Sequence, residues 1–118
     1  MIWKLLICIL SVLRYLHNDK KVIHRDLNPS NIMVDNKFNL KVTDFGLAKS
    51  LNSQTGPKMT QSFVGTVGYS APEIVQRHDY NEKADIWSLG CILHELMCLK
   101  PPFSGNNPLL LAKVIVNQ

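Results

Sequence analysis

The sequence predicts an α+β fold that is mostly helical and contains one small β-hairpin. Residues 2–17 and 82–99 carry apolar side chains at steps of three and four residues, the spacing of a helix with a buried face. Between them, short apolar runs at 32–34 and 38–43 flank the polar turn 35–37, and the second run alternates apolar with polar residues. This pattern predicts a hairpin. The 118 residues, 46% hydrophobic and 19% charged, fit one globular domain.

The first predicted helix, residues 2–17, has a broad apolar face. Its members are Ile2, Leu5, Leu6, Ile9, Val12, Leu13 and Leu16. The run from Leu5 to Leu10 resembles the core of a signal peptide, but Ser11 and Arg14 interrupt it and no small-residue cleavage site follows. The run is also too short to cross a bilayer. We therefore expect a buried helix and no membrane partner.

A polar loop is predicted between the first helix and the hairpin. It follows a short apolar step at 22–23 and covers residues 24–31, with Pro29 inside it. Loops of this kind often carry functional residues. Because an antiparallel hairpin returns the chain to its origin, this loop and the residues after the second strand should lie side by side. Asp26 and Asp44 are therefore expected to meet.

A long loop and three further helices are predicted after the hairpin. Residues 47–68 are rich in Ser, Thr, Gln, Asn and Gly, with little periodicity, so we expect a long loop that is a candidate switch. A short helix should follow residues 71–73. Residues 79–81 then supply turn and cap chemistry for the helix at 82–99, which a Pro-Pro pair ends.

The helix at 82–99 should be the buried axle of the domain, because apolar residues cover most of its circumference. They are Ala84, Ile86, Trp87, Leu89, Cys91, Ile92, Leu93, Leu96 and Met97. A last helix begins at Asn107-Pro108 and is still apolar at Val114 and Val116. We therefore expect the domain to continue beyond residue 118.

The charges and cysteines favour some cellular environments over others. The net charge of +4 comes from 13 basic and 9 acidic residues scattered along the chain, so we expect a solvated surface and no nucleic-acid partner. Three cysteines without a C-x-x-C pair favour reduced thiols in a cytoplasmic or nuclear protein. Cys91, His94 and Cys98 share one helix face and could bind a metal, but buried small hydrophobes are the favoured interpretation.

Three motifs occur in order along the chain: H-R-D-L-N-P-S-N at 24–31, D-F-G at 44–46 and A-P-E at 71–73. Together they resemble the H-R-D-L-x-x-x-N, D-F-G and A-P-E set of protein kinases. The resemblance implies the helical C-terminal lobe of a partial protein kinase domain, covering residues 1–118. Sequence segments around these motifs, such as T-D-F-G-L-A-K and E-K-A-D, look most like those of the NIMA-related kinases, especially their divergent tenth member.

The resemblance implies roles in phosphate transfer from ATP to a Ser or Thr of a protein substrate. Asp26 would accept or orient the proton of the substrate hydroxyl, while Asn31 and Asp44 would hold Mg²⁺ ions on the phosphates. Gly46 would let the backbone turn under the metal. The alternative for Asp26 and Asn31 is that they are turn and cap residues.

The resemblance also implies structural and regulatory roles. His24 and Phe45 would be packing residues. Arg25 would bind a phosphate on the activation segment, the stretch between D-F-G and A-P-E, with Ser62 as the first candidate. The other candidates are Thr55, Thr60 and Ser53. Thr66 would hydrogen-bond near Asp26.

Two more residues match anchoring positions of the kinase pattern. Asp85 would accept backbone N–H groups of the catalytic loop. Glu73 would pair with an Arg that lies further along than this sequence reaches.

Two departures from the kinase pattern affect the predicted activity. Asn28 replaces a Lys that contacts the transferring phosphate, and a Gly-rich loop, a strand Lys and a helix Glu are absent from the 118 residues. We therefore expect an ATP-gripping N-terminal lobe to be missing, and the chain alone to be inactive. The rival hypothesis is a non-catalytic pseudokinase or scaffold. A nucleotide switch of the G-x-x-x-x-G-K type is excluded because that motif is not present.

Overall fold

The computed structural model describes residues 1–43, 49–50 and 67–117. In this part the long helices are α1 (Ile2–Arg14), α4 (Lys83–Cys98) and α5 (Pro108–Asn117), with a short α3 (Pro72–Val75). A π-helical turn covers Tyr15–Asp19, and 3-10 turns cover Pro29–Asn31 and Val67–Tyr69. The strands are β1 (Val22–Ile23), β2 (Ile32–Val34), β3 (Leu40–Val42) and β4 (Lys49–Ser50). The predicted fold class, mostly helical with a small sheet, is confirmed.

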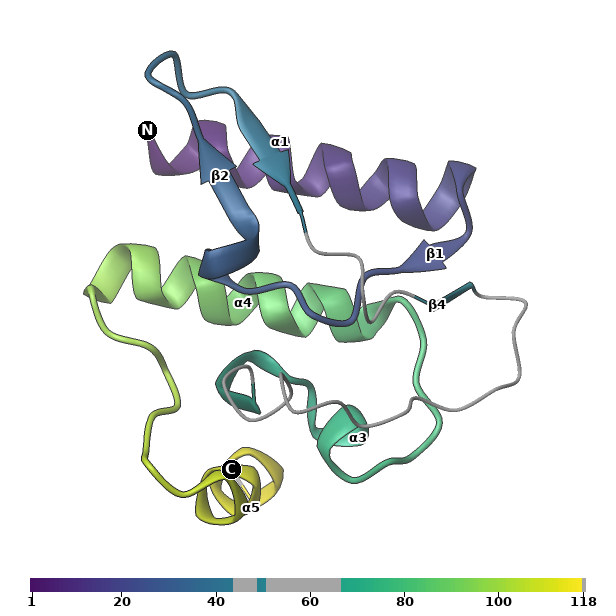
Figure 1. Ribbon diagram of the computed structural model, residues 1–118, viewed down its shortest axis with the longest axis vertical. Coiled ribbons are helices and arrows are strands. Elements are labelled where there is room, and N and C mark those ends of the chain that lie inside the picture. Colours follow the sequence, from purple (N-terminus) through teal and green to yellow (C-terminus); the bar gives the residue numbers. More distant parts are fainter. Residues whose placement is uncertain (44–48, 51–66, 118) are drawn as a thin grey trace.

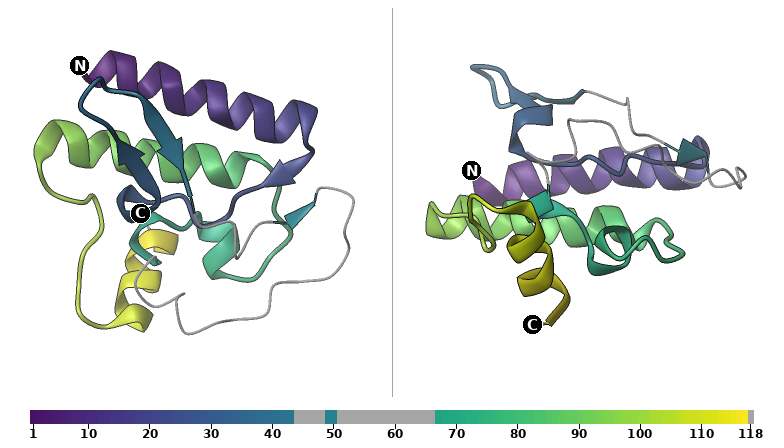
Figure 2. Two further views of the ribbon diagram at one scale, coloured as in Figure 1. Left: turned by 45° about the horizontal axis from the view of Figure 1, so that its top comes forward. Right: turned by 60° about the horizontal axis from the view of Figure 1, so that its bottom comes forward.

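The two long helices α1 and α4 lie side by side and form the centre of the molecule (Figure 1). The hairpin β2–β3 lies across one face of the pair α1 and α4 (Figure 2), and its Ile32, Leu40 and Val42 pack against the core of this pair. Helices α3 and α5 lie beyond α4 (Figure 2). The core between these layers consists of Ile9, Leu13, Leu27, Leu89 and Ile92. Leu27 comes from the loop 24–31, so this polar loop is anchored in the core by its one leucine.

The hairpin has the predicted position, with Ile32 opposite Val42 and Val34 opposite Leu40 in an antiparallel pair. Its second strand is shorter than the predicted run 38–43. Phe38 has a φ of 60°, a left-handed conformation that belongs to the turn and not to a strand. Asp35 organises this turn by accepting hydrogen bonds from the Lys37 and Asn39 amides.

Three predicted element boundaries need correction. The helix predicted over 2–17 changes at Tyr15 into a π-helical turn that ends at Asp19. The loop predicted over 47–68 contains strand β4, which pairs with β1, and its last residues, Val67 and Gly68, belong to a 3-10 turn. Strand β4 was missed because its pairing partner is distant in sequence.

The expectation that α4 is buried over most of its circumference is wrong in part. Its Ala84, Leu89, Cys91 and Ile92 are buried, but Ile86 and Met97 are exposed. The N-terminal end of α4 has the predicted cap chemistry, since the Asn81 side chain accepts the Lys83 amide at 2.9 Å. Within the described ranges, no helix is long and apolar enough to cross a membrane.

Candidate active site

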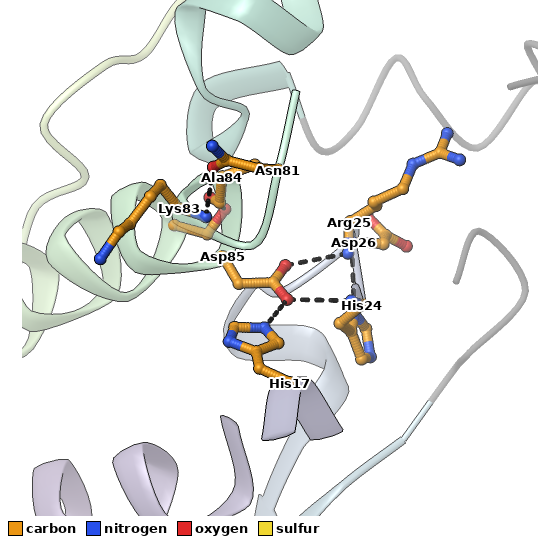
Figure 3. A network of polar contacts seen from close by, with 9 residues as sticks. His17, His24, Arg25, Asp26, Asn81, Lys83, Ala84 and Asp85 are labelled. Carbon is orange, nitrogen blue, oxygen red and sulfur yellow. Dashed lines mark hydrogen bonds and ion pairs between the residues drawn. The ribbon is translucent and has the colours of Figure 1, made fainter. Parts of the chain in front are cut away.

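Asp85 is the centre of a buried polar network that holds the loop 24–31 (Figure 3). Its Oδ1 atom accepts the Arg25 amide at 3.0 Å, and its Oδ2 atom accepts the His24 amide at 2.9 Å. His17 Nε2 lies 2.7 Å from the same Oδ2 atom. Asp85 is 0% exposed and lies in the first turn of α4, where free helix N–H groups favour a negative charge. The long helix therefore positions the loop through one carboxylate.

The backbone of Arg25 is left-handed, with a φ of 69°. A non-glycine residue in this region costs about 1 kcal/mol or more, so other contacts must hold it there. The bond from the Arg25 amide to Asp85 is one such contact. The Arg25 side chain points away from Asp85, and its guanidinium lies 5.1 Å from the centre of the Tyr80 ring (Figure 3). Its Nε atom is buried and has no hydrogen-bond partner among the described residues.

His24 connects the loop to the end of the hairpin. Its Nδ1 atom accepts the Asp26 amide at 3.2 Å, so this nitrogen carries no proton. Nε2 is therefore the protonated nitrogen, and it donates to the Thr43 carbonyl at 2.9 Å. His24 is 0% exposed, as a packing residue would be.

Asp26 is 7% exposed, and two carboxamides orient it. Asn28 Nδ2 donates to the Asp26 carbonyl at 3.0 Å and approaches Oδ1 at 3.3 Å. Asn31 Nδ2 donates to the same carbonyl at 2.6 Å and approaches Oδ2 at 3.3 Å. The Asp26 carboxylate is thus fixed from both sides.

Asn28 is both a neighbour of Asp26 and a helix cap. Its Oδ1 atom accepts the Ser30 amide at 2.9 Å, at the start of the 3-10 turn. It is buried, so its side chain is committed to the loop. A cap role was the alternative considered for Asp26 and Asn31, but the residue that caps this turn is Asn28.

The hairpin brings the end of β3 back to this loop. The Thr43 amide donates to the Asn31 carbonyl at 2.8 Å. Thr43 directly precedes Asp44 in the sequence. Asp44 itself lies outside the described residues.

Comparison with known proteins identifies the family. The protein kinase domain model matches residues 2–118. This chain belongs to the protein kinase family. It is 50% identical over 115 residues to the serine/threonine-protein kinase Nek10 of Mus musculus, an alignment that covers 98% of this chain and 10% of that protein.

Two further relatives are also named serine/threonine-protein kinases. The chain is 49% identical to the Caenorhabditis elegans serine/threonine-protein kinase D1044.8, covering 98% of this chain and 11% of that protein. It is 54% identical over 84 residues to human Nek2, covering 71% of this chain and 18% of that kinase. The predicted resemblance to the NIMA-related kinases is confirmed. This kinase chain spans about a tenth of the first relatives' length.

The predicted site residues of the kinase chain fall into three groups. The structure brings together His24, Arg25, Asp26, Asn28, Asn31 and Asp85. Glu73 lies apart in α3, where its carbonyl accepts the His78 amide at 2.9 Å. The remaining predictions lie outside the described residues: Asp44, Phe45, Gly46, Ser62 and Thr66, together with the alternatives Ser53, Thr55 and Thr60.

A second polar contact, missed by sequence reasoning, ties the segment before A-P-E to α4. The Tyr69 hydroxyl donates to the Glu95 carboxylate, and Ser88 Oγ donates to the Tyr69 carbonyl at 2.6 Å. Burial, and then the Glu95 carboxylate, raise the pKa of Tyr69 above its usual range. Tyr69 thus stays a donor at all ordinary pH values.

Sequence reasoning also missed His17. Its position on the apolar helix pattern carried no functional signal, because its partner Asp85 is 68 residues away. Among the described residues, no group of three or more His, Cys, Asp or Glu is placed to hold a metal ion. Cys91 is buried, as expected of a small hydrophobe, but Cys98 is exposed, contrary to that expectation.

Proposed function

We propose that this chain provides the phosphate-transfer loop of a protein serine/threonine kinase, with Asp26 as the residue that accepts the substrate hydroxyl proton. The observation that carries the proposal is the orientation of the Asp26 carboxylate by Asn28 and Asn31. A general base must hold its oxygen where the hydroxyl arrives. Two carboxamide donors achieve this without adding a charge. The acceptor would be a Ser or Thr of a protein, as the names of the relatives suggest.

The donor set around Asn31 is suited to a hard cation. Asn31 uses its amide nitrogen on Asp26, an arrangement that leaves its carbonyl oxygen Oδ1 available for a metal. Carboxylate and carboxamide oxygens are the ligands that Mg²⁺ prefers. Asn31 would hold Mg²⁺ together with Asp44, the residue after Thr43. When bound, Mg²⁺ would bridge and neutralise the phosphates of ATP.

Arg25 would bind a phosphate on the activation segment, with Ser62 as the proposed acceptor. This role is supported by the Arg25 Nε atom, which is buried and has no hydrogen-bond partner among the described residues. An Arg guanidinium presents a fork of donors that fits phosphate oxygens. Phe45, Gly46 and Thr66 keep their expected roles as part of this proposal.

The grip on ATP would come from residues outside these 118, because the sequence holds no Gly-rich loop and no strand Lys before the catalytic loop. We expect the chain alone to transfer no phosphate. A chimera that joins the N-terminal lobe of Nek10 to this chain should phosphorylate a Ser or Thr peptide when ATP and Mg²⁺ are supplied. Cytoplasm or nucleus is the expected location, as for reduced cysteines.

The decisive experiment compares that chimera with its Asp26→Ala and Asn31→Ala variants. Asp26→Ala should abolish transfer but keep Mg²⁺-dependent nucleotide binding, whereas Asn31→Ala should weaken that binding. The matched control is Asn39→Ala in the exposed hairpin turn. Equal transfer rates in the Asp26→Ala variant and the unmutated chimera would refute the role of Asp26. Nucleotide binding without transfer in the unmutated chimera would favour the pseudokinase alternative.

A further inference from the structure

Arg25 carries a positive charge that no described carboxylate balances. Its side chain points away from Asp85 (Figure 3), and its Nε atom is buried without a hydrogen-bond partner in the part of the chain that the structure describes. Among the same residues an ion pair joins His17 to Asp85, and none includes Arg25. Arginine side chains are seldom buried unless they are paired. The Arg25 guanidinium therefore has charge and hydrogen-bond capacity to offer to an anionic ligand.

An aromatic ring lies beside this cation. The guanidinium carbon Cζ of Arg25 lies over the Tyr80 ring, 5.1 Å from its centre. This is inside the range of about 6 Å over which a ring face attracts a cation. The ring face offers no oxygen atom that could accept the guanidinium N–H groups. The contact therefore holds the charge in place without using up the donors that would bind a ligand.

The backbone and the side chain of Arg25 are both held by the segment that leads into α4. The Arg25 amide donates to Asp85 Oδ1 at 3.0 Å, and the guanidinium lies over Tyr80. Between these two anchors, the Asn81 side chain accepts the Lys83 amide at 2.9 Å and so orders the start of the helix. A side chain that is already ordered loses less conformational entropy when it binds a ligand. Arg25 is thus a preorganised cation.

We propose that Tyr80 is a positioning residue that acts through Arg25: its ring holds the guanidinium where the N–H groups can bind a phosphate monoester. A guanidinium fork fits two oxygens of a phosphate, and the charges are opposite. The source of that phosphate, a phosphoserine on the activation segment, rests on the proposed function. The position of the guanidinium does not, because it can be observed in the chain without ATP or substrate.

The first test separates the ring of Tyr80 from its hydroxyl group by NMR on the chain labelled with ¹³C and ¹⁵N. Tyr80→Phe keeps the ring, and Tyr80→Leu keeps an apolar side chain without a ring. The side-chain protons of Arg25 should lie upfield of their usual positions in the unmutated chain and in the Phe variant, because an aromatic ring shields nuclei above its face. The Leu variant should lose this shift.

The matched control is Tyr15→Leu. It removes a second ring that lies beside a cation, 5.6 Å from Lys20 Nζ, and it should leave the Arg25 signals unchanged. Loss of the upfield shift in Tyr80→Phe as well as in Tyr80→Leu would overturn the role of the ring.

The second test uses inorganic phosphate as the probe. Phosphate should shift the Arg25 Nε–H signal and the amide signals of the loop 24–31, with equal Kd in the unmutated chain and the Tyr80→Phe variant. The Kd should be about fivefold higher in Tyr80→Leu, since the guanidinium must then be ordered on binding. Arg25→Gln should remove the amide shifts. A Leu variant that binds as tightly as the unmutated chain, or an unmutated chain without any response, would overturn the proposal.

One measurement does not depend on how well a variant folds. In the unmutated chain, through-space NMR contacts should join the ring protons of Tyr80 to the Cδ protons of Arg25. Their absence would overturn the proposal even if the Leu variant were unfolded.

The source of the phosphate is decided separately, with phosphoserine incorporated at position 62 of the otherwise unmutated chain. This residue should shift the Arg25 Nε–H signal as free phosphate does, and added phosphate should then cause no further change. If the signal stays where it is in the unmodified chain, the assignment of Ser62 in the proposed function fails. The ring contact and the response to free phosphate still decide the role of Tyr80.

Discussion

The two ends of helix α4 differ sharply in what surrounds them. At the N-terminal end, Asp85 and Ser88 are buried and bind three other segments of the chain. At the C-terminal end, Met97 and Leu99 are apolar and exposed, Leu99 by 86%. One helix therefore carries a buried polar end and an exposed apolar end, the reverse of the usual distribution.

The polar end of α4 positions the segments that contact it, because the hydrogen bonds of Asp85 and Ser88 hold the backbone of Arg25 and of Tyr69 in place. The apolar end is continuous with a pocket of about 360 Å³ between α1, the hairpin and the end of α4. Its walls include Leu5, Ile9, Val34, Leu96 and Leu99. Leu5 and Ile9 are buried, but Val34, Leu96 and Leu99 are exposed. These three side chains therefore gain little from burial. The free energy of unfolding should therefore depend mainly on the polar end of α4. The tendency of the chain to aggregate should depend on the exposed apolar end.

The largest expected effect is at the polar end. Asp85→Ala leaves the His24 and Arg25 amides and the His17 imidazole without their acceptor inside the core. The free energy of unfolding should fall by about 3–5 kcal/mol, as when one partner of a buried charged contact is removed. Urea denaturation would measure this. Asp79→Ala, at an exposed position just before the helix, should change it by less than about 0.5 kcal/mol.

Two leucines of α4 allow a direct comparison of its ends. Leu89 is 6% exposed and belongs to the core, while Leu96 is 37% exposed and lines the pocket. Leu89→Ala should cost about 3 kcal/mol because it opens a cavity, and Leu96→Ala about 1 kcal/mol or less. Equal losses in urea denaturation would mean that the apolar end is packed as tightly as the core. The comparison drawn above would then be wrong.

The two cysteines of α4 should differ in how they make the stability of the chain depend on pH. Burial raises the pKa of the Cys91 thiol from 9.0 to about 11, whereas Cys98 is exposed. Above pH 9 the unfolded chain ionises first, so the stability due to Cys91 is complete below pH 9 and is lost as the pH rises toward 11. The loss should be on the order of 2 kcal/mol. Cys91→Ala should remove this part of the alkaline slope, and Cys98→Ala should leave it in place.

The smallest expected effect has the opposite sign. Leu99 ends α4 with a φ of 58°, a left-handed conformation in which glycine is favoured. Since the Leu99 side chain is almost fully exposed, Leu99→Gly should raise the melting temperature and stabilise the chain by about 0.5–1 kcal/mol. Leu99→Ala keeps the strain and serves as the control. A stabilised Ala variant would show that the gain comes from removing exposed apolar surface.

Patterns in neighbouring residues predicted the elements that form through interactions between neighbouring residues. The three- and four-residue spacing located α1 and α4, and the turn at 35–37 with its flanking apolar runs located the hairpin. The Pro after Asn107 marked the start of α5, where the Asn107 side chain accepts the Leu109 amide. Strand β4 was missed because a two-residue strand exists only through its pairing with β1.

The sequence predicted which residues form the candidate site, but it did not predict the hydrogen bonds that join them to the rest of the fold. Asp26, Asn28, Asn31 and Asp85 were all named from motifs. The bond between His17 and Asp85, and that between Tyr69 and Glu95, had no sequence signal, because each joins residues 26 or more positions apart. Each of these residues is of a type that is common in its own segment, so nothing marks it as one half of a pair.

By itself, then, the sequence determined the helices, the hairpin, the kinase family and the residue types of the loop 24–31, because periodicity, turn chemistry and motifs are properties of neighbouring residues. Only the tertiary structure decided which face of α4 is buried, that His17 donates to Asp85, and that Asn28 caps the loop beside Asp26. Burial and long-range hydrogen bonds depend on which segments meet in space. A buried carboxylate in particular must find its donors wherever the fold brings them.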